Sequence, residues 1–268
     1  DTEHRIRAPP DNGVAAAMYA ACKATVKVGD GNEITLHEQT NYPFEETIRF
    51  TVNTPKAVSF PFYLRIPSWT EGATIFVNGK KVAANPEAGQ YACINREWKD
   101  NDQVEIQLPM QLSMRTWQVN KNSVSVDYGP LTMSLKIDED YVKKDSRATA
   151  IGDSKWQEGA DASQWPTYEI YAKTPWNYAL VLGKNKPLKD FKVVHKEWPA
   201  DNFPFTVAST PIEVKAIGRK VPSWVIDQYD LCSELPDMDA PKGEKEEITL
   251  IPMGAARLRV SAFPNTRE

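Results

Sequence analysis

The chain has 268 residues, enough for one large β domain or for two ordinary domains that each bury a sizeable core. Hydrophobic residues make up 41% and charged residues 25%, which is typical of a globular protein and excludes a disordered one. The net charge of −4 and the pI near 5.6 argue against a nucleic-acid partner, because proteins that bind the phosphate backbone carry a basic excess. No apolar run approaches the roughly 18 residues that cross a bilayer, so no membrane partner is expected.

The start of the chain and its cysteines carry little information about processing or metal binding. The first five residues, Asp1 to Arg5, are polar and lack the apolar core of a signal peptide, so we expect the sequence to begin inside a longer or processed protein. Cys22, Cys93 and Cys232 are widely spaced and form no CxxC pair, which predicts neither a disulfide framework nor a zinc cluster. One disulfide among the three cysteines is the alternative, but we interpret these cysteines as buried or half-buried free thiols.

Short strands follow one another through the first half of the chain. Alternating or β-branched residues predict strands at 14–22, 33–40, 47–52, 58–66, 74–77, 90–95, 103–108, 112–119, 123–127 and 131–137. The alanine-rich first segment would be helical on propensity alone, but it follows Gly13 and continues into β-branched residues, which favours a strand. The sharpest turn signal is Asn78-Gly79, which supplies the two positive-φ residues of a type I′ hairpin.

The second half of the chain begins with a change from alternating strand-like residues to a polar composition. Residues 138–167 are polar and are predicted to form a functional or covering loop. Further strands are predicted at 167–172, 178–182, 192–195, 205–208, 212–217, 247–251 and 257–263, with an acidic, proline-containing surface connection over 231–245. This regular succession of short strands predicts an all-β fold of the sandwich type.

The sequence contains none of the common catalytic motifs. The three histidines, His4, His37 and His195, have no metal-ligand spacing, and no GxSxG, P-loop or GxGxxG motif is present. Carboxylates are plentiful, but a glycosidase needs two that face each other across a sugar, and sequence clusters do not imply that geometry. We therefore predict no catalytic residue and no metal-binding residue in this chain.

The eight tryptophans are the more informative set, because exposed indole faces bind sugar rings. Most are expected to be packed in the core. Trp156, Trp165 and Trp176 are the candidate substrate-binding residues, since they lie in or beside the irregular stretch where binding loops concentrate.

Five short motifs point to a known family when they are taken in order. They are Tyr-Leu-Arg-Ile-Pro-Ser-Trp at 63–69, Val-Asn-Gly-Lys at 77–80, Ile-Asn-Arg-Glu-Trp-Lys-Asp-Asn-Asp at 94–102, Leu-Pro-Met at 108–110 and Tyr-Gly-Pro-Leu at 128–131. Together they resemble the C-terminal β region of glycoside hydrolase family 127, the β-L-arabinofuranosidase-like proteins. Asn101 stands where the family usually has glycine, and a turn is still expected there because Asn tolerates positive φ.

The resemblance implies two antiparallel, jelly-roll-like β-sandwich domains that exchange terminal strands. The first would span residues 21–128 and be completed by 246–268, and the second would span 129–245 and include 1–20. It also implies an N-terminal (α/α)6 barrel as a partner domain, which holds a catalytic Glu and a zinc-bound cysteine nucleophile. None of the three cysteines matches the cysteine cluster of the family, so zinc is expected in the missing domain and no cofactor in this chain.

The function expected from the resemblance is that of a non-catalytic C-terminal region. It would belong to a glycoside hydrolase that acts on L-arabinofuranoside-type plant glycans, support the barrel and present a contiguous apolar face to it. We expect a bacterial periplasmic or secreted parent protein, with an oligosaccharide as a further partner. The alternatives are an autonomous carbohydrate-binding module that uses exposed tryptophans and an independent enzyme that uses loop carboxylates.

Overall fold

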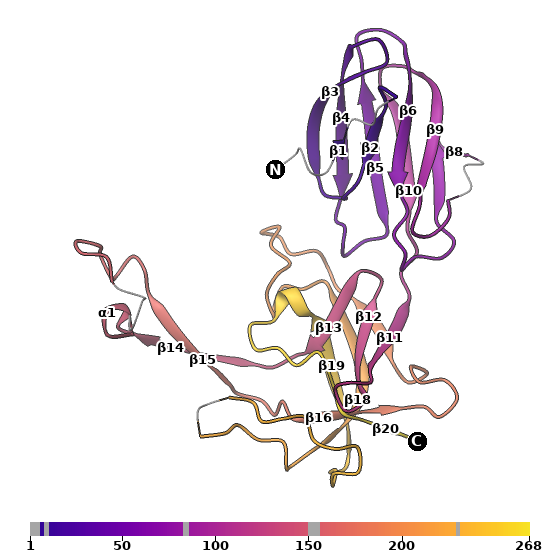
Figure 1. Ribbon diagram of the computed structural model, residues 1–268. Helices are drawn as coiled ribbons and strands as arrows, with labels where there is room; N and C mark the ends of the chain where they lie inside the picture. The colour runs from indigo at the N-terminus through magenta and orange to yellow at the C-terminus, as the bar shows by residue number, and fades with distance from the viewer. Residues whose placement is uncertain (1–5, 8–10, 83–85, 150–155, 229–230) are drawn as a thin grey trace. The chain divides into compact units, whose positions relative to one another are not determined.

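The structure is a computed structural model that describes residues 6–7, 11–82, 86–149, 156–228 and 231–268. Within these residues nearly all regular structure is β, in sheets of four, six, eight and two strands (Figure 1), and the predicted all-β class is confirmed. The chain divides into two compact units, described separately below. Unit 1 comprises residues 1–112 and 128–131, and unit 2 comprises 113–127 and 132–268. None of the described helices is long and apolar enough to cross a membrane.

Unit 1 is built from two sheets. The four-stranded sheet has the order β1 (Ile6–Arg7), β2 (Val14–Ala16), β6 (Val58–Arg65) and β9 (Tyr91–Trp98). The six-stranded sheet has the order β3 (Cys22–Val28), β4 (Asn32–Thr40), β5 (Thr47–Asn53), β10 (Asp102–Gln107), β7 (Thr74–Val77) and β8 (Lys80–Lys81). Strands β2 and β6 run parallel, and the other pairs in these two sheets are antiparallel.

The core of unit 1 lies between these sheets. Alternation along β4, β5 and β6 turns every second side chain inward, and the inward residues of both sheets join one buried cluster. Phe50 of β5 meets Phe62 of β6 edge-on, with their ring centroids 5.2 Å apart. Trp98 is fully buried, and its indole N–H donates to the carbonyl oxygen of Phe60 at 2.9 Å. The apolar residues that alternate along the predicted early strands therefore form the core of a sandwich.

The predicted turns of unit 1 are present. Asn78 and Gly79 have φ of 50° and 75°, as the type I′ hairpin between β7 and β8 requires. Asn101 has φ of 63°, which confirms that the turn survives the replacement of the usual glycine.

Unit 2 contains an eight-stranded sheet. Its order is β11 (Leu112–Trp117), β12 (Ser123–Tyr128), β13 (Leu131–Leu135), β19 (Lys245–Pro252), β18 (Ile212–Lys220), β16 (Tyr178–Leu182) and β20 (Asn265–Arg267), and β17 (Lys192–His195) pairs with β18. The 3-10 helix η2 (Met253–Ala255) follows β19. Strands β12 and β16 are buried on both faces of the sheet along their whole length.

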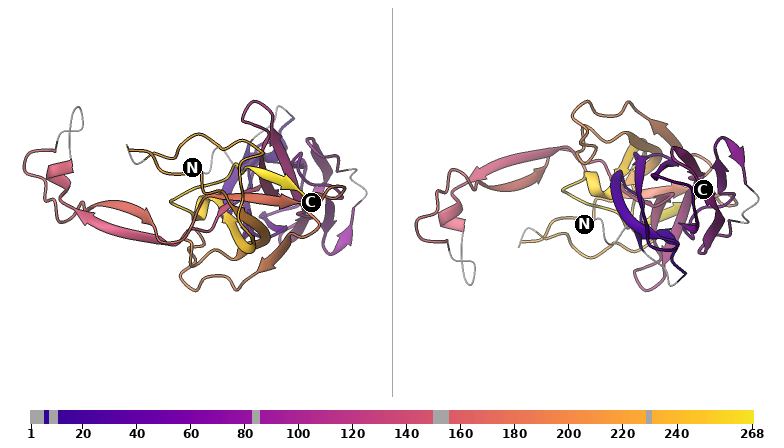
Figure 2. Two further views of the ribbon diagram at one scale, coloured as in Figure 1. Left: turned by 90° about the horizontal axis from the view of Figure 1, so that it is seen from below. Right: turned by 90° about the horizontal axis from the view of Figure 1, so that it is seen from above.

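A two-stranded hairpin corrects the prediction of a loop over residues 138–167. Strands β14 (Glu139–Lys144) and β15 (Thr167–Ala172) pair antiparallel, and α1 (Ser146–Thr149) follows β14. Figures 1 and 2 show this hairpin as a ribbon that leaves the sheet of unit 2. Both of its faces are largely exposed, so the sequence lacks the apolar alternation of a strand that covers a core.

Other predicted elements also differ from the structure. Of residues 14–22, the structure places 14–16 in β2 and only Cys22 in β3, and residues 205–208 lead into a turn and form no strand. Residues 257–263 are irregular, with a single β-bridge from Phe263 to Val124, whereas β20 was not predicted. The terminal strands pair differently from the predicted exchange, since β1 and β2 lie in the sheet of β6 in unit 1 and β19 joins β13 and β18 in unit 2.

Candidate functional site

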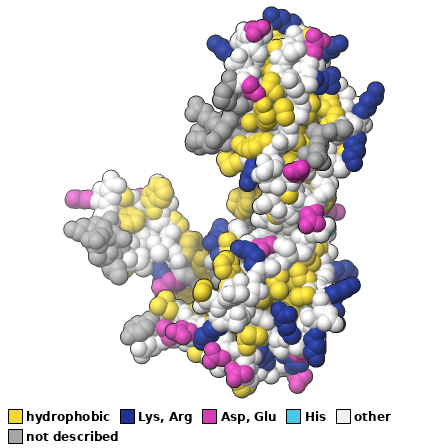
Figure 3. Space-filling model, turned by 45° about the vertical axis from the view of Figure 1, so that its right-hand side comes forward, with side chains coloured by type: hydrophobic (Ala, Val, Ile, Leu, Met, Phe, Trp, Pro, Cys, Tyr) yellow, Lys and Arg dark blue, Asp and Glu magenta, His cyan; other side chains and the backbone are white. Residues whose placement is uncertain are grey.

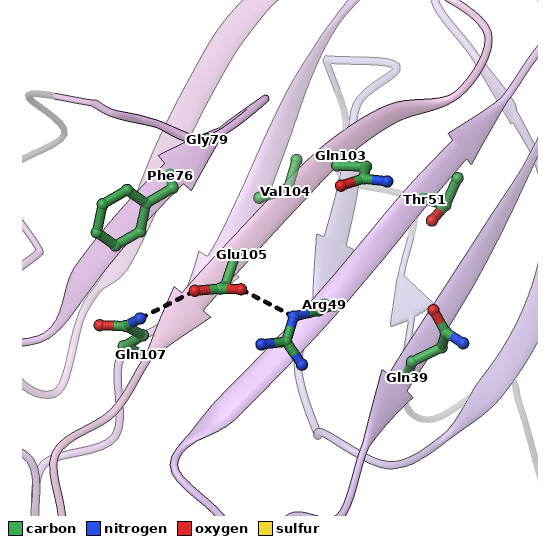
Figure 4. Close-up of a pocket in the computed structure, with 9 residues that line it drawn as sticks. All are labelled: Gln39, Arg49, Thr51, Phe76, Gly79, Gln103, Val104, Glu105 and Gln107. Atoms are coloured by element: carbon green, nitrogen blue, oxygen red, sulfur yellow. Dashed lines mark hydrogen bonds and ion pairs between the residues drawn. The ribbon is translucent and has the colours of Figure 1, made fainter.

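The outer face of the six-stranded sheet in unit 1 carries a row of polar side chains that ends in an aromatic ring. Strand register places Gln39 opposite Arg49, Arg49 opposite Glu105, and Glu105 opposite Phe76. The row therefore crosses four strands, β4, β5, β10 and β7, as Figure 4 shows. All four residues have the outward parity of their strands, because the alternate positions Glu38, Ile48, Ile106 and Ile75 fill the core.

Two further rows flank the first one. On one side Gln103 lies opposite Thr51, and on the other side Gln107 is paired with Thr47 of β5 and Thr74 of β7. The hydroxyl of Thr74 donates to the side-chain carbonyl oxygen of Gln107 at 3.3 Å. The outer face is thus a grid of amides and hydroxyls around one ion pair.

A hollow of about 350 Å³ lies over this grid. It is lined by Gln39, Arg49, Thr51, Phe76, Gly79, Gln103, Val104, Glu105 and Gln107. Its centre is the ion pair between Arg49 Nε and Glu105 Oε2 at 2.8 Å, and Gln107 Nε2 donates to the other carboxylate oxygen at 2.9 Å. The two formal charges offset each other, so the hollow is neutral and rich in hydrogen-bonding groups. Such a surface suits recognition of a polar molecule more than acid–base chemistry.

The three tryptophans predicted to bind substrate lie in unit 2. Trp165 is 68% exposed, and Trp156 is half-buried, with its indole N–H donating to the carbonyl oxygen of Ala160 at 3.3 Å. Trp176 contacts Trp224 edge-on with centroids 5.1 Å apart, beside a small buried cluster. The structure thus leaves Trp165 open to a ligand and gives Trp176 a packing role.

The cysteines and histidines form no site in the described part of the chain. Cys22 is half-buried, as expected, and donates to Glu38 at 3.6 Å, whereas Cys93 and Cys232 are exposed, which corrects the expectation that these two are buried or half-buried. All three are free thiols. Among the described residues no group of His, Cys, Asp and Glu is able to hold a metal ion. His4 lies outside the described residues.

One buried carboxylate in unit 2 has a strongly perturbed pKa. Glu213 of β18 is 7% exposed and faces the ammonium groups of Lys136 at 2.9 Å, Lys196 at 3.2 Å and Lys215 at 3.4 Å. Burial alone would raise its pKa, but hydrogen bonds and attraction from Lys136 and Lys196 outweigh burial and lower the pKa to about 2. A carboxylate that stays ionised at neutral pH is a weak base, so we assign this cluster a structural role.

The family follows from a comparison with known protein families. Residues 13–110 match the family model described as the middle domain of GH127 beta-L-arabinofuranosidase. This part of the chain is therefore similar to the middle domain of glycoside hydrolase family 127. The matching model is of the same family that the five motifs indicated, but it is that of the GH127 middle domain and not of a C-terminal region. No curated protein matches the chain.

Solved structures show the same fold over almost the whole chain. A GH127 beta-L-arabinofuranosidase from Geobacillus stearothermophilus T6 aligns with a TM-score of 0.62 and 21% identity, covering 98% of this chain and 35% of its own. A glycoside hydrolase aligns at 0.60 with 22% identity, covering 96% and 36%. A GH127 beta-arabinofuranosidase aligns at 0.60 with 20% identity, covering 96% and 35%. The chain therefore spans about a third of the length of these structures, and at this identity the likeness shows the fold alone.

Proposed function

We propose that this chain is the non-catalytic β-sandwich region of a GH127 glycoside hydrolase that acts on L-arabinofuranoside-type plant glycans. In this proposal it supports an N-terminal (α/α)6 barrel, and the catalytic Glu and the zinc-bound cysteine belong to that barrel. The observation that carries the proposal is the match of unit 1 to the GH127 middle domain. The length of the solved neighbours is consistent with it, because about two thirds of each lies outside the region that this chain covers.

The residues of this chain do not fit the zinc site that the family implies. Cys22 bonds to a buried carboxylate in unit 1, and Cys93 lies on the outer face of β9, whereas Cys232 lies in unit 2. Since the described residues also include no other ligand group for a metal, the proposal assigns zinc to the barrel.

Exposed aromatic side chains in each unit support a role beside another domain. On the outer face of the four-stranded sheet in unit 1, Tyr63 lies opposite Cys93, and the neighbouring Tyr91 is 50% exposed. Figure 3 shows hydrophobic side chains gathered at the surface of unit 1. In unit 2, one face of the β14–β15 hairpin presents Tyr141 and Tyr168, with ring centroids 6.1 Å apart. Exposed aromatic side chains that lie close together are common where one protein surface contacts another.

Activity and stability measurements on separated parts of the parent protein test the proposal. We expect no hydrolysis of a chromogenic β-L-arabinofuranoside by the 268-residue chain and hydrolysis by the parent protein. The barrel segment without this chain should unfold at a lower temperature than it does in the parent. Hydrolysis by this chain alone, abolished by one carboxylate substitution, would instead support an independent enzyme.

The alternative of an autonomous carbohydrate-binding module is favoured by one observation, the 68% exposure of Trp165. It predicts that the isolated chain binds plant cell-wall oligosaccharides in calorimetry and that Trp165→Ala abolishes the heat. An unchanged heat in that variant would exclude Trp165 as the platform.

A further inference from the structure

The hollow on the outer face of unit 1 has the chemistry of a site for a neutral, hydroxyl-rich ligand. We propose that it is a subsite for one residue of a neutral carbohydrate, held by the row Gln39–Arg49–Glu105–Phe76. This inference goes beyond the supporting role proposed above and does not depend on it. It rests on the charge balance, the free hydrogen-bonding groups and the aromatic end of the row.

The charge balance selects a neutral ligand. Arg49 is the one cation and Glu105 the one anion among the residues that line the hollow, and their ion pair at 2.8 Å neutralises both. An anionic ligand would have to compete with Glu105 for the guanidinium, and a cationic one would have to compete with Arg49. A neutral polyol needs to displace neither of them, because its hydroxyls hydrogen-bond to the remaining donors and acceptors of the pair.

The hydrogen-bonding groups around the pair are both fixed and available. Glu105 is held from two sides, by Arg49 and by Gln107, so its orientation is set before a ligand arrives and less side-chain entropy is lost on binding. The side chains of Gln39 and Gln103 make no hydrogen bond to any other described residue and are exposed. Each amide offers one acceptor and two donors, which matches hydroxyl groups that both donate and accept.

Phe76 supplies the apolar part of the site. It is half-exposed at the end of the row, beside Glu105 on β10 and Lys81 on β8. Among the side chains that line the hollow its ring is the one aromatic surface, and Figure 4 shows it at the rim opposite Gln39. A sugar ring has C–H groups on its faces and hydroxyls at its edge, so the ring of Phe76 and the polar row match the two parts of one sugar residue.

The size of the hollow sets the expected affinity. Its volume of about 350 Å³ lies at the lower end of small-molecule sites, which fits a single sugar residue and not a long chain. A ligand of about ten heavy atoms at the usual binding energy per atom gives a dissociation constant on the order of millimolar. Tighter binding of an oligosaccharide than of the free sugar would show that neighbouring residues of the sheet add contacts.

The test is an NMR titration of the ¹⁵N-labelled 268-residue chain with L-arabinose, with an arabino-oligosaccharide and with sodium sulfate. The side-chain amide signals of Gln39, Gln103 and Gln107 report directly on the hollow. We expect saturable shifts of these signals with at least one sugar and none with sulfate beyond the effect of ionic strength. Sugar shifts confined to unit 2, saturable shifts with sulfate alone, or no saturable shift up to about 100 mM, far above the affinity expected for one sugar residue, would each overturn the proposal.

Variants separate the hollow from the rest of the face. Phe76→Ala and Gln103→Ala should each weaken sugar binding at least fivefold. The matched control is Thr25→Ala, which removes a hydroxyl from the same outer face outside the hollow and should leave the affinity unchanged. Folding of every variant is checked by its circular dichroism, and Gln103→Ala serves if Phe76→Ala does not fold. Equal affinity in Gln103→Ala and the unchanged chain would overturn the proposal.

Discussion

Asn78 Nδ2 donates to Asp102 Oδ1 at 2.8 Å and joins two turns that lie 24 residues apart in the chain. In return Asn78 Oδ1 accepts from the backbone N–H of Gln103 at 2.8 Å, while the other oxygen of Asp102 accepts from the backbone N–H of Lys99 at 2.9 Å. Two of the motifs that indicated the family, Val-Asn-Gly and Arg-Glu-Trp-Lys-Asp-Asn-Asp, thus meet in one hydrogen-bond network. Both motifs therefore have a structural role in unit 1 of this chain.

Asp102 should stabilise unit 1 in a pH-dependent way. Its partial burial raises the pKa, but the N–H of Lys99, Asn78 and the charge of Arg96 together lower the pKa below 3.8. The contribution is therefore complete above the unfolded pKa and is lost as pH falls through the folded value. We expect Asp102→Asn to lower the free energy of unfolding by about 1–3 kcal/mol at pH 7. Urea unfolding at pH 7 and near pH 3 checks this, and a deficit that is the same at both pH values contradicts it.

Trp98 should be the most costly tryptophan to replace in unit 1. Its ring is fully buried against Phe60 and Phe62, and its N–H satisfies a buried carbonyl. Trp98→Ala should cost about 3–5 kcal/mol through the cavity it leaves. Trp98→Phe should cost about 1–3 kcal/mol through the lost hydrogen bond. Unfolding followed by circular dichroism measures both, with the exposed Trp165→Phe as a control expected to stay within about 0.5 kcal/mol.

Gly129, in the Tyr-Gly-Pro-Leu motif, is required for two separate reasons. Its φ is +54°, and a Cβ placed there would lie 2.6 Å from Cγ of Met110. Gly72 has φ of +75° with nothing within 4 Å, so Gly72→Ala measures the backbone cost alone, about 1–2 kcal/mol. Gly129→Ala should cost about 1–3 kcal/mol more than this control because of the clash. Combining it with Met110→Ala should recover part of that excess, and strict additivity of the two substitutions would argue against the clash.

Local chemistry explains which parts of the fold the sequence predicts. The Asn78-Gly79 turn and the strands with one buried face are predictable from the sequence, because turn residues and apolar alternation are local patterns. Strand β14 was missed because Tyr141 and the charges around it face solvent, so no alternation separates a core face from a water face, whereas its partner β15 coincides with the strand predicted at 167–172. Residues 257–263 alternate like a strand, yet Val260 accepts the backbone N–H of Leu135 within an irregular segment.

The candidate site could not be predicted from the sequence for a different reason. Alternation predicts that Arg49 and Glu105 point outward, but they are 56 residues apart, and only strand register places them opposite each other. The tryptophans drew attention because exposed indole faces bind sugar rings, whereas the aromatic group of the hollow is Phe76, which is one of nine phenylalanines.

The ionised Glu213 should stabilise unit 2 at neutral pH and lose this effect in acid. Because its folded pKa of about 2 lies below the unfolded value of 4.5, its contribution is present above about pH 4.5 and is lost as pH falls toward 2. The difference in pKa corresponds to about 3 kcal/mol at pH 7, and the carboxylate is shielded enough, at 9% side-chain exposure, for most of this to be realised.

Glu213→Gln should therefore lower the free energy of unfolding of unit 2 by up to about 3 kcal/mol at pH 7 and by little near pH 2. The matched control is Glu234→Gln, whose side chain is 94% exposed beside Lys121 and which should change stability by less than about 0.5 kcal/mol. The stability of both variants is measured by thermal unfolding between pH 2 and pH 7, and hydrogen exchange of the backbone amides in the strands of unit 2 assigns the change to that unit. If the curves of Glu213→Gln and the unchanged chain stay parallel over this range, the three lysines do not stabilise unit 2 through an ionised Glu213.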